Sequence, residues 1–187
     1  PVRQAEVTQA AITGREIPGP LRPLHGLSML LNRGLAVLAG IALAVLTLLT
    51  VADVAMRAFG RPIAGSFEVI GWLSAVALAL ALGYTQAHRG HVAMTLVTDL
   101  LRGRSAALLD ALNSLAALVL FAIVAWVVIR YGQTLQESGS LSETLKALVY
   151  PWVFVVAAGF VVLALTLLVD LLLALARLFW AGEAPAR

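Results

Sequence analysis

The sequence predicts an all-α integral membrane protein with four transmembrane helices. This prediction rests on four uncharged, strongly apolar runs at residues 34–52, 69–87, 111–129 and 147–169. Each run is close to the ~20 residues that a helix needs to cross a hydrocarbon layer ~30 Å thick. Because a chain in lipid must satisfy its own backbone hydrogen bonds, a helix is the expected form of each run.

The composition excludes several classes of function. Of the 187 residues, 61% are hydrophobic and 12% are charged, whereas about 25% are charged in a soluble domain. The four spans use most of this length and leave no room for a soluble catalytic domain. Cysteine is absent, which excludes disulfides and thiolate metal sites. A formal net charge of +3 is expected of basic residues at one lipid surface, so no nucleic-acid partner is predicted.

The start of the chain predicts a tail that leads into the membrane. Residues 1–23 contain several prolines, mixed charges and little apolar periodicity, which indicates a flexible tail. A transmembrane domain is expected at 24–181, followed by a short C-terminal tail at 182–187. Leucines on one face of residues 24–33 suit an interfacial segment before a first span at about 34–58.

The first two spans are predicted to form a hairpin. Gly60 and Pro62 end the first helix, because glycine and proline both disfavour its continuation. The short turn leaves the second span, at about 66–88, antiparallel to the first. Ser66 is a suitable N-cap for this helix, and Glu68 in its first turn complements the helix dipole.

The second half of the chain predicts two further spans, at about 105–131 and 151–180. Residues 91–101 are too short and too polar to cross the membrane. A short interfacial segment between the second and third helices is therefore expected there, with a plain loop as the alternative.

The connection before the last span contains a helix-start signal. Ser140 and Glu143 have the spacing of a capping box, which predicts a short helix at 141–149. Pro151 then suits the first turn of the last helix, where a missing N–H is tolerated.

The placement of arginine and lysine predicts that both termini are cytoplasmic. Nine of these residues fall on the side of the termini, and four fall on the other side. Those four are Arg57, Arg61, Arg130 and Lys146. Because basic residues are enriched in cytoplasmic segments, the two connections that carry these four residues are expected to face outward.

Few ionisable residues lie at membrane depth, where ion coupling or catalysis would need them. Asp53 and Arg57 are spaced i,i+4 and are expected to pair on one helix face. A sharper alternative is that Arg57, Arg61 and Glu68 fix the first hairpin and a partner interface.

Asp170 is the deepest acidic residue of the chain. A proton relay there would need an intramembrane partner, and the sequence shows none. An inner-surface salt bridge is the prediction, with Arg33, Arg104 or Arg177 as its partner.

Three motifs resemble those of a known transporter family. Residues 57–68 read Arg-Ala-Phe-Gly-Arg-Pro-Ile-Ala-Gly-Ser-Phe-Glu. This stretch resembles a motif of the DctQ-like small membrane subunit of tripartite ATP-independent periplasmic (TRAP) transporters. Residues 89–92, Arg-Gly-His-Val, resemble the family's Arg-Gly-x-His-Ile element with one residue fewer, and Pro151-Trp152 resembles the start of its fourth span. The resemblance covers roughly residues 30–180.

The resemblance implies a non-catalytic small permease subunit of a sodium-coupled importer in the bacterial inner membrane. In that family a large DctM-like subunit carries the substrate, typically an organic acid, and a periplasmic binding protein delivers it. The small subunit scaffolds the large one and helps to dock the binding protein. No cofactor and no metal is implied.

Two groups of residues are candidates for contacts. The outward group combines the family motifs into a partner interface: Arg57, Gly60, Pro62, Gly65, Ser66, Glu68, Pro151 and Trp152. The inner group is expected to meet anionic lipid head groups or to lie at the inner interface: Arg33, Arg89, His91, Arg102, Arg104 and Asp170.

Two other functions stay open on the sequence. A self-sufficient, homo-oligomeric, proton-coupled exporter would need a deep acidic residue, and Glu68 is the nearest candidate. A haem-bearing anchor of a respiratory complex would need histidines from two helices at similar depth. His88 and His91 share one boundary and do not supply that arrangement.

Overall fold

The computed structural model describes residues 22–89 and 104–180 and places four helices in them. These helices are α2 (Arg22–Ala58), α3 (Ser66–Arg89), α5 (Arg104–Ser138) and α6 (Tyr150–Trp180). Each is long and apolar enough to cross a membrane. The predicted all-α fold class with four membrane-spanning helices is therefore confirmed for the described part of the chain.

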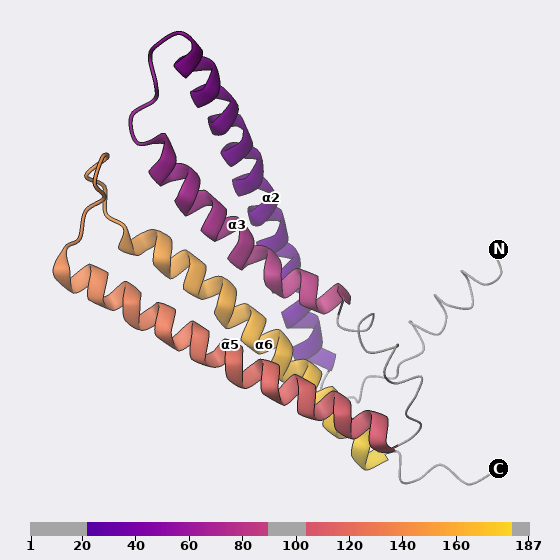
Figure 1. The fold of residues 1–187 in the computed structure, drawn as a ribbon. Helices are drawn as coiled ribbons and strands as arrows, with labels where there is room; N and C mark the ends of the chain where they lie inside the picture. The colour runs from indigo at the N-terminus through magenta and orange to yellow at the C-terminus, as the bar shows by residue number, and fades with distance from the viewer. Residues whose placement is uncertain (1–21, 90–103, 181–187) are drawn as a thin grey trace, which may run out of the picture.

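The helices form two hairpins that pack against each other (Figure 1). α2 packs against α3, α5 packs against α6, and α6 also contacts α3 and α2. The connections 59–65 and 139–149 lie at the same end of the helices, which we call the turn end. Because α5 packs mainly against α6, the helices form an open arrangement with α5 at one edge.

The inner pair of helices carries most of the buried surface. One third of the most apolar window is buried in α3 and in α6, against 11% in α2 and 6% in α5. The contact between α3 and α6 is close, since a Cβ atom at Gly159 would lie only 2.7 Å from the carbonyl carbon of Ala79. Small residues of this kind let transmembrane helices approach backbone to backbone. α2 and α5 therefore present most of their surface outward.

A buried polar cluster joins α2 to α6 far from the turn end. The Nδ2 of Asn32 donates to the Thr166 hydroxyl at 2.7 Å and to the Ser28 hydroxyl at 3.4 Å. The two hydroxyls lie 3.2 Å apart. Asn32 is 1% exposed, and Gly83 of α3 leaves room for it, because a Cβ there would overlap its Oδ1 atom. The sequence patterns did not single out this cluster.

The predicted bounds of the helices need two changes. Residues 24–33 continue α2 instead of forming a separate segment, so the first helix is longer than the predicted span. The third helix ends at Ser138 and not near Tyr131, so that prediction was wrong by about two turns. Gly132 stays helical because it is buried against Phe154, whose ring lies 3.0 Å from where its Cβ would be.

The predicted helix at 141–149 is wrong. Leu141 and Leu148 form an isolated antiparallel bridge, and the Ser142 N–H donates to the Ala147 carbonyl at 2.9 Å. The N–H of Ser140 is already used, since it donates to the Leu135 carbonyl in the Schellman motif that closes α5.

A glycine ends each of the two helices that lead into the turn end, α2 and α5. Gly60 and Gly139 have φ angles of +71° and +60°, respectively, in the left-handed region that helix C-termini favour. At Gly60 the N–H donates to the Arg57 carbonyl at 2.9 Å, and the next N–H donates to the Met56 carbonyl at 3.0 Å. The predicted break at Gly60 is confirmed.

Candidate functional site

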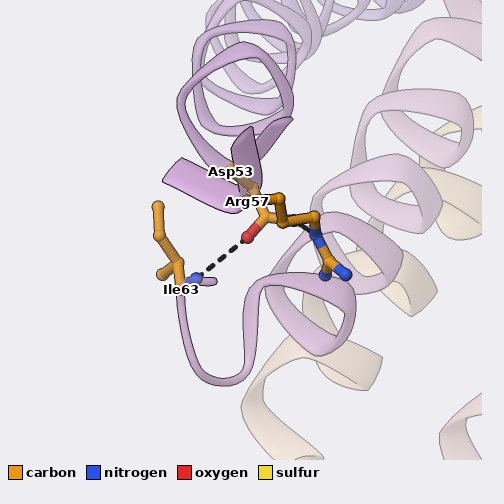
Figure 2. A network of polar contacts seen from close by, with 3 residues as sticks. All are labelled: Asp53, Arg57 and Ile63. Carbon is orange, nitrogen blue, oxygen red and sulfur yellow. Dashed lines mark hydrogen bonds and ion pairs between the residues drawn. The ribbon is translucent and has the colours of Figure 1, made fainter. Parts of the chain in front are cut away.

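The first part of the candidate site ties the end of α2 to the turn that follows it. Asp53 is 4% exposed, and its Oδ2 accepts a hydrogen bond from the Nε of Arg57 at 2.7 Å. Its Oδ1 accepts a hydrogen bond from the backbone N–H of Ile63 at 3.1 Å (Figure 2). The expected pair on one helix face is confirmed, and the same carboxylate also holds the 59–65 turn.

Arg57 extends this contact to the second helix. Its guanidinium carbon lies 4.8 Å from the centre of the Phe67 ring, in the first turn of α3. A guanidinium at this distance from an aromatic face is attracted to it electrostatically. Arg57 therefore links the end of α2 to the start of α3, as the sharper of the two sequence hypotheses requires of a hairpin-fixing residue.

The second part of the site ties α3 to the other hairpin through Glu68. Its Oε1 accepts a hydrogen bond from the Thr144 N–H at 2.7 Å, and its Oε2 accepts one from the Leu145 N–H at 3.1 Å. One carboxylate thus binds two successive backbone amides of the 139–149 connection. Glu68 does lie in the first turn of α3, as expected, but its sequence spacing could not reveal partners 76 and 77 residues away.

Gly65 packs closely against the 139–149 connection. It has a φ angle of +77°, and any side chain there would overlap the side chain of Leu145. The position therefore requires glycine twice, once for its backbone conformation and once for space. Ser66 follows as the first residue of α3 and is 2% exposed. The prediction of Ser66 as the N-cap was wrong by one residue, because the first N–H groups of α3 donate to the Gly65 carbonyl at 3.1 and 3.2 Å.

An aromatic stack joins α3 and α6 just inside these polar contacts. The rings of Trp72 and Trp152 are stacked with centroids 5.4 Å apart. Pro151 lies in the first turn of α6, as predicted, and is exposed. Five of the outward candidates lie at the turn end, where each contacts a neighbouring residue or is buried: Arg57, Gly65, Ser66, Glu68 and Trp152.

Several large apolar side chains at the turn end are exposed. Phe59 is 81% exposed and Phe67 is 72% exposed, and Leu141 of the second connection is also exposed. Arg61 and Lys146 lie on the same two connections and are exposed as well. We call these five residues the turn-end surface.

The inner candidates are only partly described. Arg33 is exposed on α2, and Asp170 is partly buried on α6. Arg89 is the last residue of α3 and Arg104 is the first of α5, while His91, Arg102 and the predicted interfacial segment lie outside the described residues. Arg33 forms no ion pair with Asp170, whose expected salt bridge with Arg104 or Arg177 stays a prediction. Among the described residues, no group of three histidine or acidic side chains could hold a metal ion.

Comparison with known proteins identifies the family. Residues 46–177 match the family model of tripartite ATP-independent periplasmic transporters, DctQ component. No curated protein and no solved structure gave a match. The matched region begins within α2 and ends within α6, so it includes the whole turn-end cluster. Because the match covers more than half of the chain, the chain belongs to the DctQ family of TRAP transporter small permease subunits.

Proposed function

We propose that this chain is the non-catalytic scaffold of a sodium-coupled TRAP importer that takes up an organic acid. The DctQ family implies a large DctM-like subunit and a periplasmic binding protein as its partners. In this proposal the large subunit holds the substrate and coupling sites and moves. The small subunit stays static, braces it and contributes to the surface on which the binding protein docks.

The observation that carries the scaffolding role is the open helix arrangement. α2 and α5 bury only about a tenth or less of their most apolar windows inside the chain. Hydrocarbon and a partner's helices are both suitable cover for such surfaces. Two carboxylates of the turn end are engaged in fixing connections, since Asp53 and Glu68 bind backbone amides of the two turns. Such a chain is better suited to supporting a moving partner than to moving cargo.

We assign the docking role to the turn-end surface. Its connections are held by carboxylates and by the Gly65–Leu145 contact, which gives a partner a preorganised surface. Exposed aromatic and basic residues, such as Phe59, Phe67 and Arg61, are residue types that enrich protein interfaces. Placing the turn end on the periplasmic side follows from the distribution of basic residues.

We further propose that the opposite end, with both termini, lies on the cytoplasmic side of a bacterial inner membrane. There Arg33, together with Arg89, His91, Arg102 and Arg104, is proposed to meet anionic lipid head groups. A basic residue near such a surface contributes about 1 kcal/mol. We propose residues 24–181 as the membrane domain, a proposal supported by helices that run from Arg22 to Trp180.

The proton-coupled exporter is less well supported. Its candidate carboxylate, Glu68, accepts two backbone hydrogen bonds near the membrane surface. A proton-exchanging group must instead alternate between states at depth.

Reconstitution separates the proposals. Liposomes that contain this chain, the large subunit and the binding protein should accumulate an organic acid under an inward sodium gradient. Liposomes without this chain should not. Liposomes with this chain alone should accumulate nothing, and solute accumulation by them under a sodium or proton gradient would contradict the scaffold proposal.

A further inference from the structure

The most distinctive unassigned feature is an apolar groove between α2 and α3. It has a volume of about 560 Å³. Its floor consists of small residues, among them Ala36, Gly40, Ala77 and Ala81. A Cβ atom at Gly40 would meet nothing within 4 Å, so the groove is open above that residue.

The length of the groove matches one leaflet of a bilayer. On α2 it extends from Ala36 to Leu46, and on α3 from Ser74 to Thr85. At 1.5 Å per residue these stretches are about 15 and 16 Å long. A hydrocarbon layer is ~30 Å thick, so the groove crosses about half of it. A partner's transmembrane helix would need a groove through the whole layer, whereas one acyl chain needs one leaflet.

The groove has a polar, cationic end. Arg33 precedes Gly40 by seven residues, so the two lie within about 20° of each other around α2. Arg33 is exposed and forms no ion pair with any residue that the structure describes. On α3 the same end of the groove carries two hydroxyl-bearing residues, Tyr84 and Thr85.

We propose that this groove binds one anionic phospholipid of the cytoplasmic leaflet. One acyl chain lies over Gly40 between α2 and α3, and the phosphate meets Arg33 beside Tyr84 and Thr85. This inference rests on the proposed cytoplasmic placement of the end opposite the turns. It adds a defined lipid site to the general contact with head groups. A lipid bound there would also cover apolar surface of α2, a helix that buries little of its most apolar window.

Two pairs of matched variants test the site. Gly40→Leu fills the groove, and Gly34→Leu places the same side chain at another position on α2, where a Cβ atom would also meet nothing within 4 Å. The two positions are six residues apart and so face different directions. Arg33→Gln removes the cation at the groove end, and Arg61→Gln removes an exposed cation at the turn end.

The measurement is native mass spectrometry of the purified full chain, equilibrated in detergent with equal amounts of dioleoyl phosphatidylglycerol and dioleoyl phosphatidylcholine. The wild-type chain should retain one phosphatidylglycerol in preference to phosphatidylcholine. Arg33→Gln should lower that preference about five-fold, the factor for one basic contact. Gly40→Leu should lower retention of both lipids. Arg61→Gln and Gly34→Leu should behave as wild type.

Three results would overturn the proposal. Equal retention of the two lipids by the wild-type chain would remove the head-group site. Equal losses in Gly40→Leu and Gly34→Leu would indicate unspecific lipid. Unchanged lipid retention in Gly40→Leu, with loss of co-purifying large subunit, would place a partner helix in the groove. The lipid measurement needs no partner, so it can fail while the transporter assignment stands.

Discussion

Polar contacts hold distant segments together at both ends of the helices, but the chemistry of these contacts differs between the two ends. At the turn end, the carboxylates of Asp53 and Glu68 hold backbone amides of the two connections. Far from that end, neutral side chains of Asn32, Ser28 and Thr166 join α2 to α6. On α6, Thr166 lies about 24 Å from the start of the helix at the turn end. Both arrangements fix elements that are distant in the sequence.

The difference follows from the charge on the acceptor. Hydrogen bonds to a charged group contribute about 1.5–3 kcal/mol, roughly twice as much as neutral ones. The amide and hydroxyl groups of Asn32, Ser28 and Thr166 are neutral and are buried against one another. Their bonds contribute less, on average about 0.6 kcal/mol in membrane helices. Substitutions at the turn end should therefore lower stability more than substitutions in the buried cluster of Asn32, Ser28 and Thr166.

The largest effect is expected at Gly65. Gly65→Val combines a branched side chain at a positive φ angle with an overlap on Leu145, while Gly60→Val has a similar φ angle in open space. The conformational cost alone is roughly 1–3 kcal/mol in either variant. Thermal unfolding in detergent should show a clearly lower midpoint for Gly65→Val than for Gly60→Val. Equal midpoints would mean that the 139–149 connection does not rest on Gly65.

Loss of the Glu68 carboxylate should loosen the second connection while the helices stay folded. Because the chain has no cysteine, a spin label on Lys146→Cys reports on this connection alone. Glu68→Ala should increase the label's mobility and weaken assembly or uptake, with unchanged helix content by circular dichroism. The control is Glu143→Ala, which removes an exposed carboxylate from the same connection. Normal uptake and complex yield in Glu68→Ala would count against the docking role.

A moderate effect is expected from substitutions in the buried cluster of Asn32, Ser28 and Thr166. Asn32→Ala and Thr166→Val each remove one partner of the 2.7 Å bond, and their combination should reveal a coupling of roughly 0.6 to 1.7 kcal/mol in a double-mutant cycle. Thr47→Val is the matched control, because the Thr47 hydroxyl bonds only its own helix, at the Leu43 carbonyl. A coupling as large with Thr47 as with Thr166 would show that the cluster is not specific.

The sequence was most informative where the physics is local. Apolar runs of membrane length predicted the four spans, and the i,i+4 spacing predicted the Asp53–Arg57 pair, which the structure confirms. Gly60 predicted the end of α2 because a left-handed glycine closes a helix within a few residues.

The sequence was least informative where distant segments compete for the same groups. Ser140 and Glu143 fit a local capping box, yet the Ser140 N–H donates to the Leu135 carbonyl at the end of α5. Glu68 binds the amides of Thr144 and Leu145 instead. Gly139 was the signal in the sequence for the end of α5, because glycine is common just after a helix C-terminus. The partners of Glu68 and of Asn32 lie 76 and 134 residues away. Such contacts depend on helix packing, which no spacing rule encodes.

The smallest effect is expected for Arg57→Gln, although Arg57 lies at the centre of the turn-end cluster. Its side chain is 43% exposed, and exposed ion pairs contribute little because water screens them. Asp53 keeps its bond from the Ile63 N–H in this variant, whereas Asp53→Leu loses both contacts and leaves the Ile63 N–H without its acceptor. The unfolding midpoint should fall less in Arg57→Gln than in Asp53→Leu, and added salt should narrow the gap between wild type and Arg57→Gln. If Arg57→Gln were as damaging as Asp53→Leu and insensitive to salt, the contact with Phe67 would be the dominant link between α2 and α3.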